Sequence, residues 1–145
     1  MNNSTEASVL KAIFKSAQTG SQSITDIMPQ VKDTGLREDL NRHREEYERI
    51  SDEAELCLGR LGEAAKEPGA MQKFGMKMGI EMETALDTTA SHIAEVMING
   101  STMGIINVTK IMNGYPNAEP DTRRLSERFI NSERENIERM KNYLQ

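Results

Sequence analysis

The sequence predicts an all-α protein, an antiparallel four-helix bundle built from two related helical hairpins. Its 145 residues suffice for one hydrophobic core and therefore for a single domain, residues 1–145. Strong helix formers dominate, whereas aromatic residues make up 4% of the chain and Trp is absent. A domain built from strands needs more aromatic and β-branched residues than this. Apolar residues also recur at intervals of three and four, which places them on one face of a helix.

The first helix is predicted over residues 5–31. Pro29 is expected to kink or tighten its last turn, because proline lacks a backbone donor and crowds the preceding turn. A short connection, 32–35, follows, in which Asp33 or Thr34 can cap the next helix. One apolar stripe runs along this helix: Val9, Ile13, Ser16, Gly20, Ile24, Ile27 and Val31.

The second helix, predicted over residues 35–66, has the clearest pattern in the chain. Its seam residues alternate by four and three, as in a bundle helix that packs at a shallow angle. We expect the sequence Glu67-Pro68-Gly69 to end it. The seam consists of Leu36, Leu40, His43, Tyr47, Ile50, Ala54, Cys57 and Leu61.

A third helical region is predicted over residues 70–113, which is too long to match its neighbours in a bundle. Capping side chains at 87–89 predict a break there, which leaves 70–86 as an extra connecting element. The sequence 113–116 predicts a stop with Gly114 in a left-handed conformation. Pro120 suits the first turn of a last helix that continues to about Leu144.

Two parts of the chain resemble each other. Residues 44–50 and 134–140 share the pattern Arg-Glu-x-x-Glu-Arg, and the same register aligns His43 with Glu133. Upstream, Gly20 aligns with Gly100, and both glycines are expected to mark a close approach of helices. We interpret the chain as a hairpin over 5–66, the connecting element 70–86 and a second hairpin over 88–145. The alternative is chance similarity between helices rich in Glu and Arg.

Composition excludes several classes of function. A net charge of −5 and a pI of about 5.2 argue against binding to nucleic acid. No secretion signal and no apolar run of membrane-spanning length is present, so we expect a cytoplasmic protein without a membrane partner. The single cysteine, Cys57, cannot form an internal disulfide and is expected to be an inert core residue.

Two related hairpins, a helix-1 glycine and the Asp33-x-x-Leu36 start of the second helix resemble the ferritin-like superfamily. More narrowly, the chain is similar to small bacterial ferritin-like bundle proteins classed as a domain of unknown function. The resemblance covers nearly the whole chain and implies the fold more than an activity. Ferritin-like di-iron sites use two Glu residues and two Glu-x-x-His motifs.

This chain departs from that pattern. It carries Ser21 and Ser101 beside the two glycines, the reversed motif His43-x-x-Glu46, and Glu133-x-x-Asn136 without an imidazole. No Glu-x-x-His occurs anywhere, so a standard di-iron site is not expected.

His43 and Glu133 nevertheless occupy predicted seam positions, where a buried charge is costly unless it is paired or ligated. One hypothesis is that the two side chains pair across the bundle. The other is that they hold one Fe, Mn or Zn ion with Glu46, and with His92 or Glu81 as a further ligand.

The leading functional prediction is a non-enzymatic protein without a cofactor that acts through protein contacts, as a homodimer or with a protein partner. The methionine-rich element 70–86 is the predicted contact surface. The alternative is a metal-binding protein that acts in redox chemistry or in metal storage. The sequence contains neither a phosphate-binding loop nor a Ser-His-Asp grouping, so no motif in it indicates an enzyme.

Overall fold

The computed structural model describes residues 3–65 and 87–145. Within these ranges it contains no strand, so the predicted all-α class is confirmed. The helices are α1 (Asn3–Ile27), the 3-10 helix η1 (Met28–Gln30), α2 (Thr34–Arg60), α4 (Ala90–Gly114) and α5 (Pro120–Lys141).

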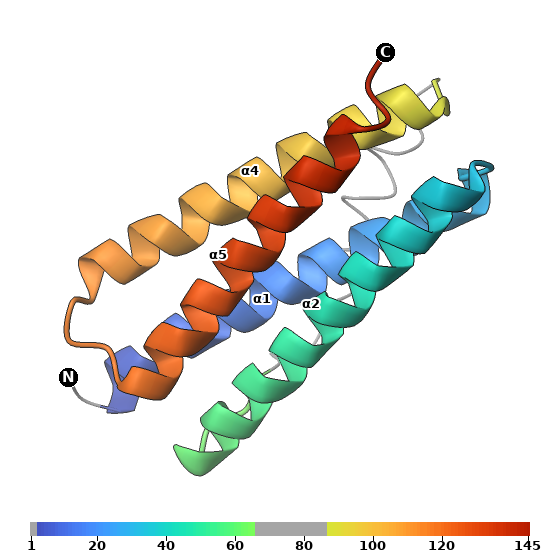
Figure 1. Cartoon of the computed structure of the whole chain (residues 1–145). Coiled ribbons are helices and arrows are strands. Elements are labelled where there is room, and N and C mark those ends of the chain that lie inside the picture. The colour runs from blue at the N-terminus through green and yellow to red at the C-terminus, as the bar shows by residue number, and fades with distance from the viewer. Residues whose placement is uncertain (1–2, 66–86) are drawn as a thin grey trace.

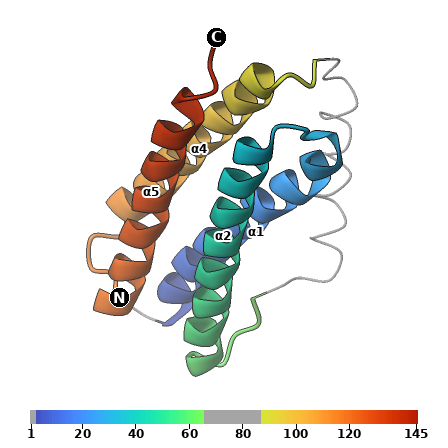
Figure 2. The same cartoon turned by 45° about the vertical axis from the view of Figure 1, so that its right-hand side comes forward.

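The four long helices form two pairs. The chain runs along α1 and returns along α2, and it repeats this path along α4 and α5 (Figure 1). Helices α2 and α5 join the pairs by packing on each other, whereas α1 and α4 meet over a shorter stretch. In the turned view, α5 and α2 lie in front of α4 and α1 (Figure 2). The division of the chain into two related hairpins with a connecting element stays a prediction.

Apolar side chains from all four helices fill one core between the two pairs. The predicted seam residues of α2 are buried from Leu36 to Ala54. In the next turn the buried residue is Leu58, and the predicted Cys57 is only partly buried. Of the seven predicted stripe positions, four in α1 and Val31 after η1 are buried, and only Ser16 and Gly20 are partly exposed. None of the described helices is long and apolar enough to cross a membrane.

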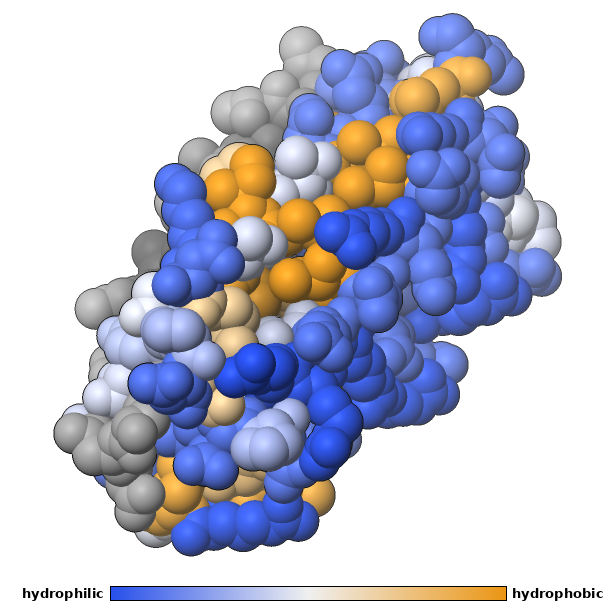
Figure 3. Space-filling view, turned by 60° about the vertical axis from the view of Figure 1, so that its left-hand side comes forward, coloured by the Kyte–Doolittle hydropathy of each residue, from blue (hydrophilic) through white to orange (hydrophobic). Residues whose placement is uncertain are grey.

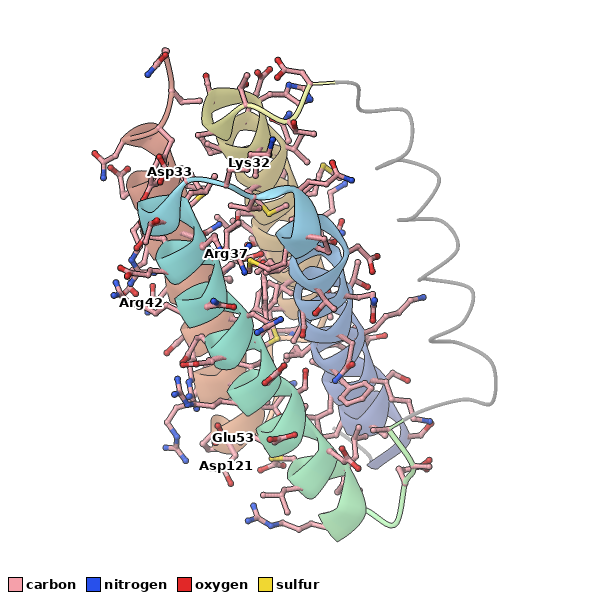
Figure 4. The ribbon with its side chains drawn as sticks, turned by 90° about the vertical axis from the view of Figure 1, so that its right-hand side faces the viewer. Lys32, Asp33, Arg37, Arg42, Glu53 and Asp121 are labelled. Atoms are coloured by element: carbon pink, nitrogen blue, oxygen red, sulfur yellow. The ribbon has the colours of Figure 1, made fainter. Side chains whose placement is uncertain are left out.

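The first connection follows the prediction closely. Pro29 lies in η1, which tightens the end of the first helical segment. The Asp33 carboxylate accepts a hydrogen bond from the Leu36 N–H at 2.9 Å and caps α2. Arg37 points back toward this connection, where its guanidinium donates to the Met28 and Val31 carbonyls at 2.9 Å each (Figure 4).

The end of α2 differs from the prediction. The helix stops at Arg60 and not near residue 66, because Gly62 adopts a left-handed conformation with φ of 74°. The Glu63 N–H then donates to the Leu58 carbonyl and the Gly62 N–H to the Gly59 carbonyl. These two bonds form a Schellman motif, which ends the helix before Pro68 is reached.

The second pair of helices begins where predicted. Residues 87–89 are not helical, and the Thr89 hydroxyl caps α4 by accepting from the His92 N–H at 3.2 Å, so the predicted break is confirmed. Helix α4 ends at Gly114 as expected, but this glycine is helical and not left-handed. Pro120 opens α5, which ends at Lys141 and not at Leu144. The predicted contact element, 70–86, lies outside the described residues.

Candidate functional site

The two charged seam residues meet in the core between α2 and α5. The Nε2 atom of His43 lies 2.8 Å from Oε1 of Glu133, and both side chains are at most 2% exposed. This distance is that of an ion pair when His43 is protonated, although the alignment is not that of a hydrogen bond. The predicted pairing of His43 and Glu133 across the bundle is therefore present.

Two hydroxyl groups converge on the same carboxylate oxygen. Tyr47 donates to Oε1 of Glu133 at 2.5 Å, and Ser101 donates to it at 3.3 Å. Asn136 extends the cluster, because its Nδ2 donates to the Ser101 hydroxyl at 3.0 Å. Burial and the neighbouring Glu133 charge raise the pKa of Tyr47 well above its usual value, so the phenol keeps its proton and donates.

Helical spacing explains why these groups meet. Tyr47 follows His43 by one turn of α2, and their ring centroids lie 4.1 Å apart. Asn136 follows Glu133 by three residues of α5, so both point to the same side of that helix. Ser101, from α4, completes the contact between the two pairs of helices.

Two glycines make room for the cluster. A Cβ atom at Gly20 would overlap the ring of Tyr47, and one at Gly104 would overlap Oε2 of Glu133. The predicted close approach is thus present at Gly20. It is wrong for Gly100, where a Cβ would meet nothing within 4 Å, because that glycine faces open space.

The cluster is incompletely satisfied by the described residues. His43 Nδ1 and Asn136 Oδ1 are buried, and neither has a hydrogen-bond partner there. Leaving such a group unpaired costs about 1–3 kcal/mol, and native proteins contain few of them. His43 Nε2 lacks a hydrogen-bond partner as well, so three unpaired polar atoms lie in one small cluster, which makes it a candidate binding site.

A groove of about 840 Å³ opens between α1 and α4 above this cluster. Its walls are mostly apolar or small side chains, and its floor includes His43, Tyr47, Glu133 and Asn136. Helices α1 and α4, which form its walls, pack less extensively on each other than α1 on α2, α4 on α5 or α2 on α5. An apolar cleft with a few convergent polar groups is the usual form of a ligand site.

Glu46 does not join His43 and Glu133. Its Oε1 accepts from the Arg128 Nε at 2.8 Å, and its Oε2 accepts from Arg49 at 3.3 Å. Partial burial raises the pKa of Glu46, but the hydrogen bonds and charges of Arg128 and Arg49 outweigh this effect, and the pKa falls below its usual value. This carboxylate is therefore committed to an arginine network between α2 and α5.

The residues described here do not assemble a metal site. Two of the three named ligands, His43 and Glu133, come together, but Oε1 of Glu133 already accepts from Tyr47 and Ser101. Within 3–65 and 87–145, no three His, Cys, Asp or Glu side chains gather as a metal ion requires. His92 lies at the start of α4, and Glu81 lies outside the described residues.

Cys57 shows no sign of nucleophilic activation. The side chain is half-buried against the core, and burial raises the pKa of its thiol. A raised pKa lowers the thiolate fraction at neutral pH, which agrees with the expectation of a weakly nucleophilic thiol.

Sequence reasoning named the central pair but not its partners. Tyr47 was visible only as an apolar seam residue, although its position one turn after His43 was a signal for contact with the same group. Ser101 and Asn136 stood out only as departures from a ferritin-like ligand pattern.

Neither a family model nor a curated protein nor a solved structure matches this chain.

Proposed function

We propose that this chain is a non-enzymatic, cytoplasmic bundle of the antiparallel, ferritin-like type that acts by self-association, as a homodimer formed through α4. The observation that carries this proposal is the charge pattern of α4. Only Glu95 and Lys110 are charged within its 25 residues. By contrast, α2 and α5 carry a charged residue at about every second position.

A helix with so few charges is normally enclosed on all sides. Helix α4 is not, because Met103 is 54% exposed and Ile106 is 40% exposed. Figure 3 shows a face of the molecule on which apolar side chains gather in a band beside a strongly polar region. We call the exposed side of α4 around Met103 and Ile106 the α4 outer surface. A second copy of the chain would remove it from water.

The two charges of α4 favour a particular geometry. Glu95 and Lys110 are both exposed, and they lie at nearly equal distances in sequence from Thr102 and Met103. If two copies of α4 cross antiparallel at that centre, Glu95 of each copy faces Lys110 of the other. The two charges are about 22 Å apart along the helix, so both pairs form at the edges of the apolar contact.

A charge swap tests this geometry. Glu95→Lys and Lys110→Glu should each weaken the dimer about three- to tenfold, because each variant places like charges opposite each other twice. The double variant should restore the wild-type dissociation constant, measured by sedimentation equilibrium. The net charge of −5 becomes −3 in the first variant and −7 in the second, so overall charge cannot explain weakening in both.

A second pair of variants tests the apolar contact. Ile106→Glu should weaken the dimer by at least about tenfold, since the symmetric contact would bury two unpaired carboxylates. Leu56→Glu is the matched control, because Leu56 is 64% exposed but lies on the charged helix α2. A chain that stays monomeric at every concentration, or that loses association equally in both variants, would refute the proposal.

A further inference from the structure

The floor of the groove between α1 and α4 has a defined pattern of donors and acceptors. Glu133 is approached by Tyr47 and Ser101, both of which donate to its Oε1. The Ser101 hydroxyl has a single proton, and this proton goes to the carboxylate. The Ser101 oxygen can then only accept, so Asn136 must present its Nδ2 to it at 3.0 Å.

This chain of bonds fixes the orientation of the Asn136 amide. Its Oδ1 is the atom that stays unpaired among the described residues, and the side chain is 1% exposed in a residue that lines the groove. His43 also lines the groove, and its Nδ1 is unpaired as well. The Tyr47 and Ser101 hydroxyl protons are used within the cluster, whereas the unpaired atom of the Asn136 amide is an acceptor.

The walls select for apolar character. Ile24 of α1 and Val96, Met97 and Ile111 of α4 all face the groove. Gly100 also lines the groove, and a Cβ atom there would contact nothing within 4 Å, so this position has room for a larger side chain. The volume of about 840 Å³ lies within the range of small-molecule sites.

We infer that this groove binds a small apolar molecule that carries a hydroxyl or amino group, and that Asn136 Oδ1 accepts a hydrogen bond from that group. The apolar body lies against the walls of α1 and α4, and the donor reaches the floor. The groove borders the α4 outer surface, because Met103 and Lys110 also line it. The inference does not depend on self-association, since the groove lies within one copy of the chain.

A matched pair of probes tests the inference. 1-Naphthol and 1-methylnaphthalene have nearly the same size and shape, but only 1-naphthol has a hydroxyl donor. Binding is followed by the fluorescence of the probe, since the chain contains no Trp to interfere. We expect 1-naphthol to bind at least about tenfold more tightly, because a buried unpaired acceptor discriminates strongly between a donor and a methyl group.

Two variants locate the binding. Gly100→Leu adds a bulky side chain to a groove-lining position where a Cβ atom meets nothing within 4 Å, and it raises helix propensity. We expect it to fold and to lose at least about tenfold in affinity for 1-naphthol. Gly59→Leu, the same change on α2 where a Cβ also meets nothing, should leave binding unchanged. Asn136→Leu should lower the affinity for 1-naphthol to that for 1-methylnaphthalene.

The outcomes are decisive in both directions. No binding of 1-naphthol, equal affinity for both probes, or unchanged binding by the folded Gly100→Leu variant overturns the inference. The Gly100→Leu result holds even if Asn136→Leu fails to fold.

Discussion

At the scale of single residues, the structure is organised around one buried carboxylate. Glu133 is 1% exposed, and its Oε1 is surrounded by the His43 imidazole and two hydroxyl donors. Removing a carboxylate from water costs several kcal/mol, which such contacts must offset. Tyr47 is the closest of these donors, so it should contribute most among the neutral ones.

The raised pKa of Tyr47 predicts how stability responds to alkaline pH. The unfolded phenol loses its proton near pH 10, while the folded phenol keeps it to a higher pH. The free energy of unfolding is therefore unaffected below pH 10 and falls as pH rises above 10, by at most about 1.4 kcal/mol per pH unit from this residue.

Tyr47→Phe should remove that part of the decline. At pH 8 the variant should be less stable by about 1.5–3 kcal/mol, because Glu133 loses a hydrogen bond, and the difference should shrink above pH 10. Urea unfolding followed by circular dichroism between pH 8 and 11.5 measures both effects. Tyr143→Phe is the comparison, since its phenol donates to Asp39 and has its pKa raised to about 12. A difference that does not change with pH would contradict the expectation.

The two glycines that align in sequence should respond in opposite ways to the same substitution. Gly20→Ala forces a methyl group into the ring of Tyr47, which Glu133 holds in place, so we expect a loss of about 1–3 kcal/mol. Gly100→Ala meets nothing and gains helix propensity, so it should stabilise by up to about 1 kcal/mol. Thermal unfolding of both variants measures the contrast, and equal effects would disprove it.

These residues also show how far sequence reasoning reaches. The three-and-four spacing identified the buried face of each helix, and His43 and Glu133 could be placed on facing seams from that pattern alone. Which glycine contacts a ring depends on helix crossing and on the rotamer of Tyr47. Neither is encoded in the spacing, so Gly104 was missed and Gly100 was misread.

At the scale of elements, starts of helices were easier to predict than their ends. Asp33 and Thr89 cap α2 and α4 through side-chain oxygens, a signal that is local and chemically specific. The end of α2 was missed because Pro68 is the stronger breaker in general, but Gly62 comes first along the chain. A glycine within a helix and a glycine that ends one look alike until the backbone is seen, as Gly59 and Gly62 show.

At the scale of the whole molecule, charge is distributed unevenly. The α2–α5 side carries the arginine and carboxylate networks, in which Arg128 contacts both Glu46 and Glu53 across the helix pairs. The α1–α4 side has few charges and contains the groove. Exposed ion pairs contribute little each, so the charged side serves solubility and the register of α2 against α5. The weakly charged side is left for contact with other molecules.

One buried carboxylate joins the first long helix to the start of the last one, and this contact gives a test of whole-molecule cooperativity. Glu6 of α1 is 4% exposed, and its Oε1 accepts from the Glu119 N–H at 2.9 Å. That amide begins α5, whose own N-cap residue makes no side-chain cap, so a side chain from the other helix pair caps it.

Glu6→Ala should lower the free energy of unfolding by about 1–2 kcal/mol, because α5 loses its cap and its favourable charge. Ser8→Ala is the control, since the Ser8 hydroxyl bonds only within its own helix and is exposed, and it should have little effect. Urea unfolding should stay a single transition in both variants, with the signal of α1 and α5 lost together. If Glu6→Ala instead separated unfolding into two steps, the two helix pairs would be independent units joined mainly by this cap.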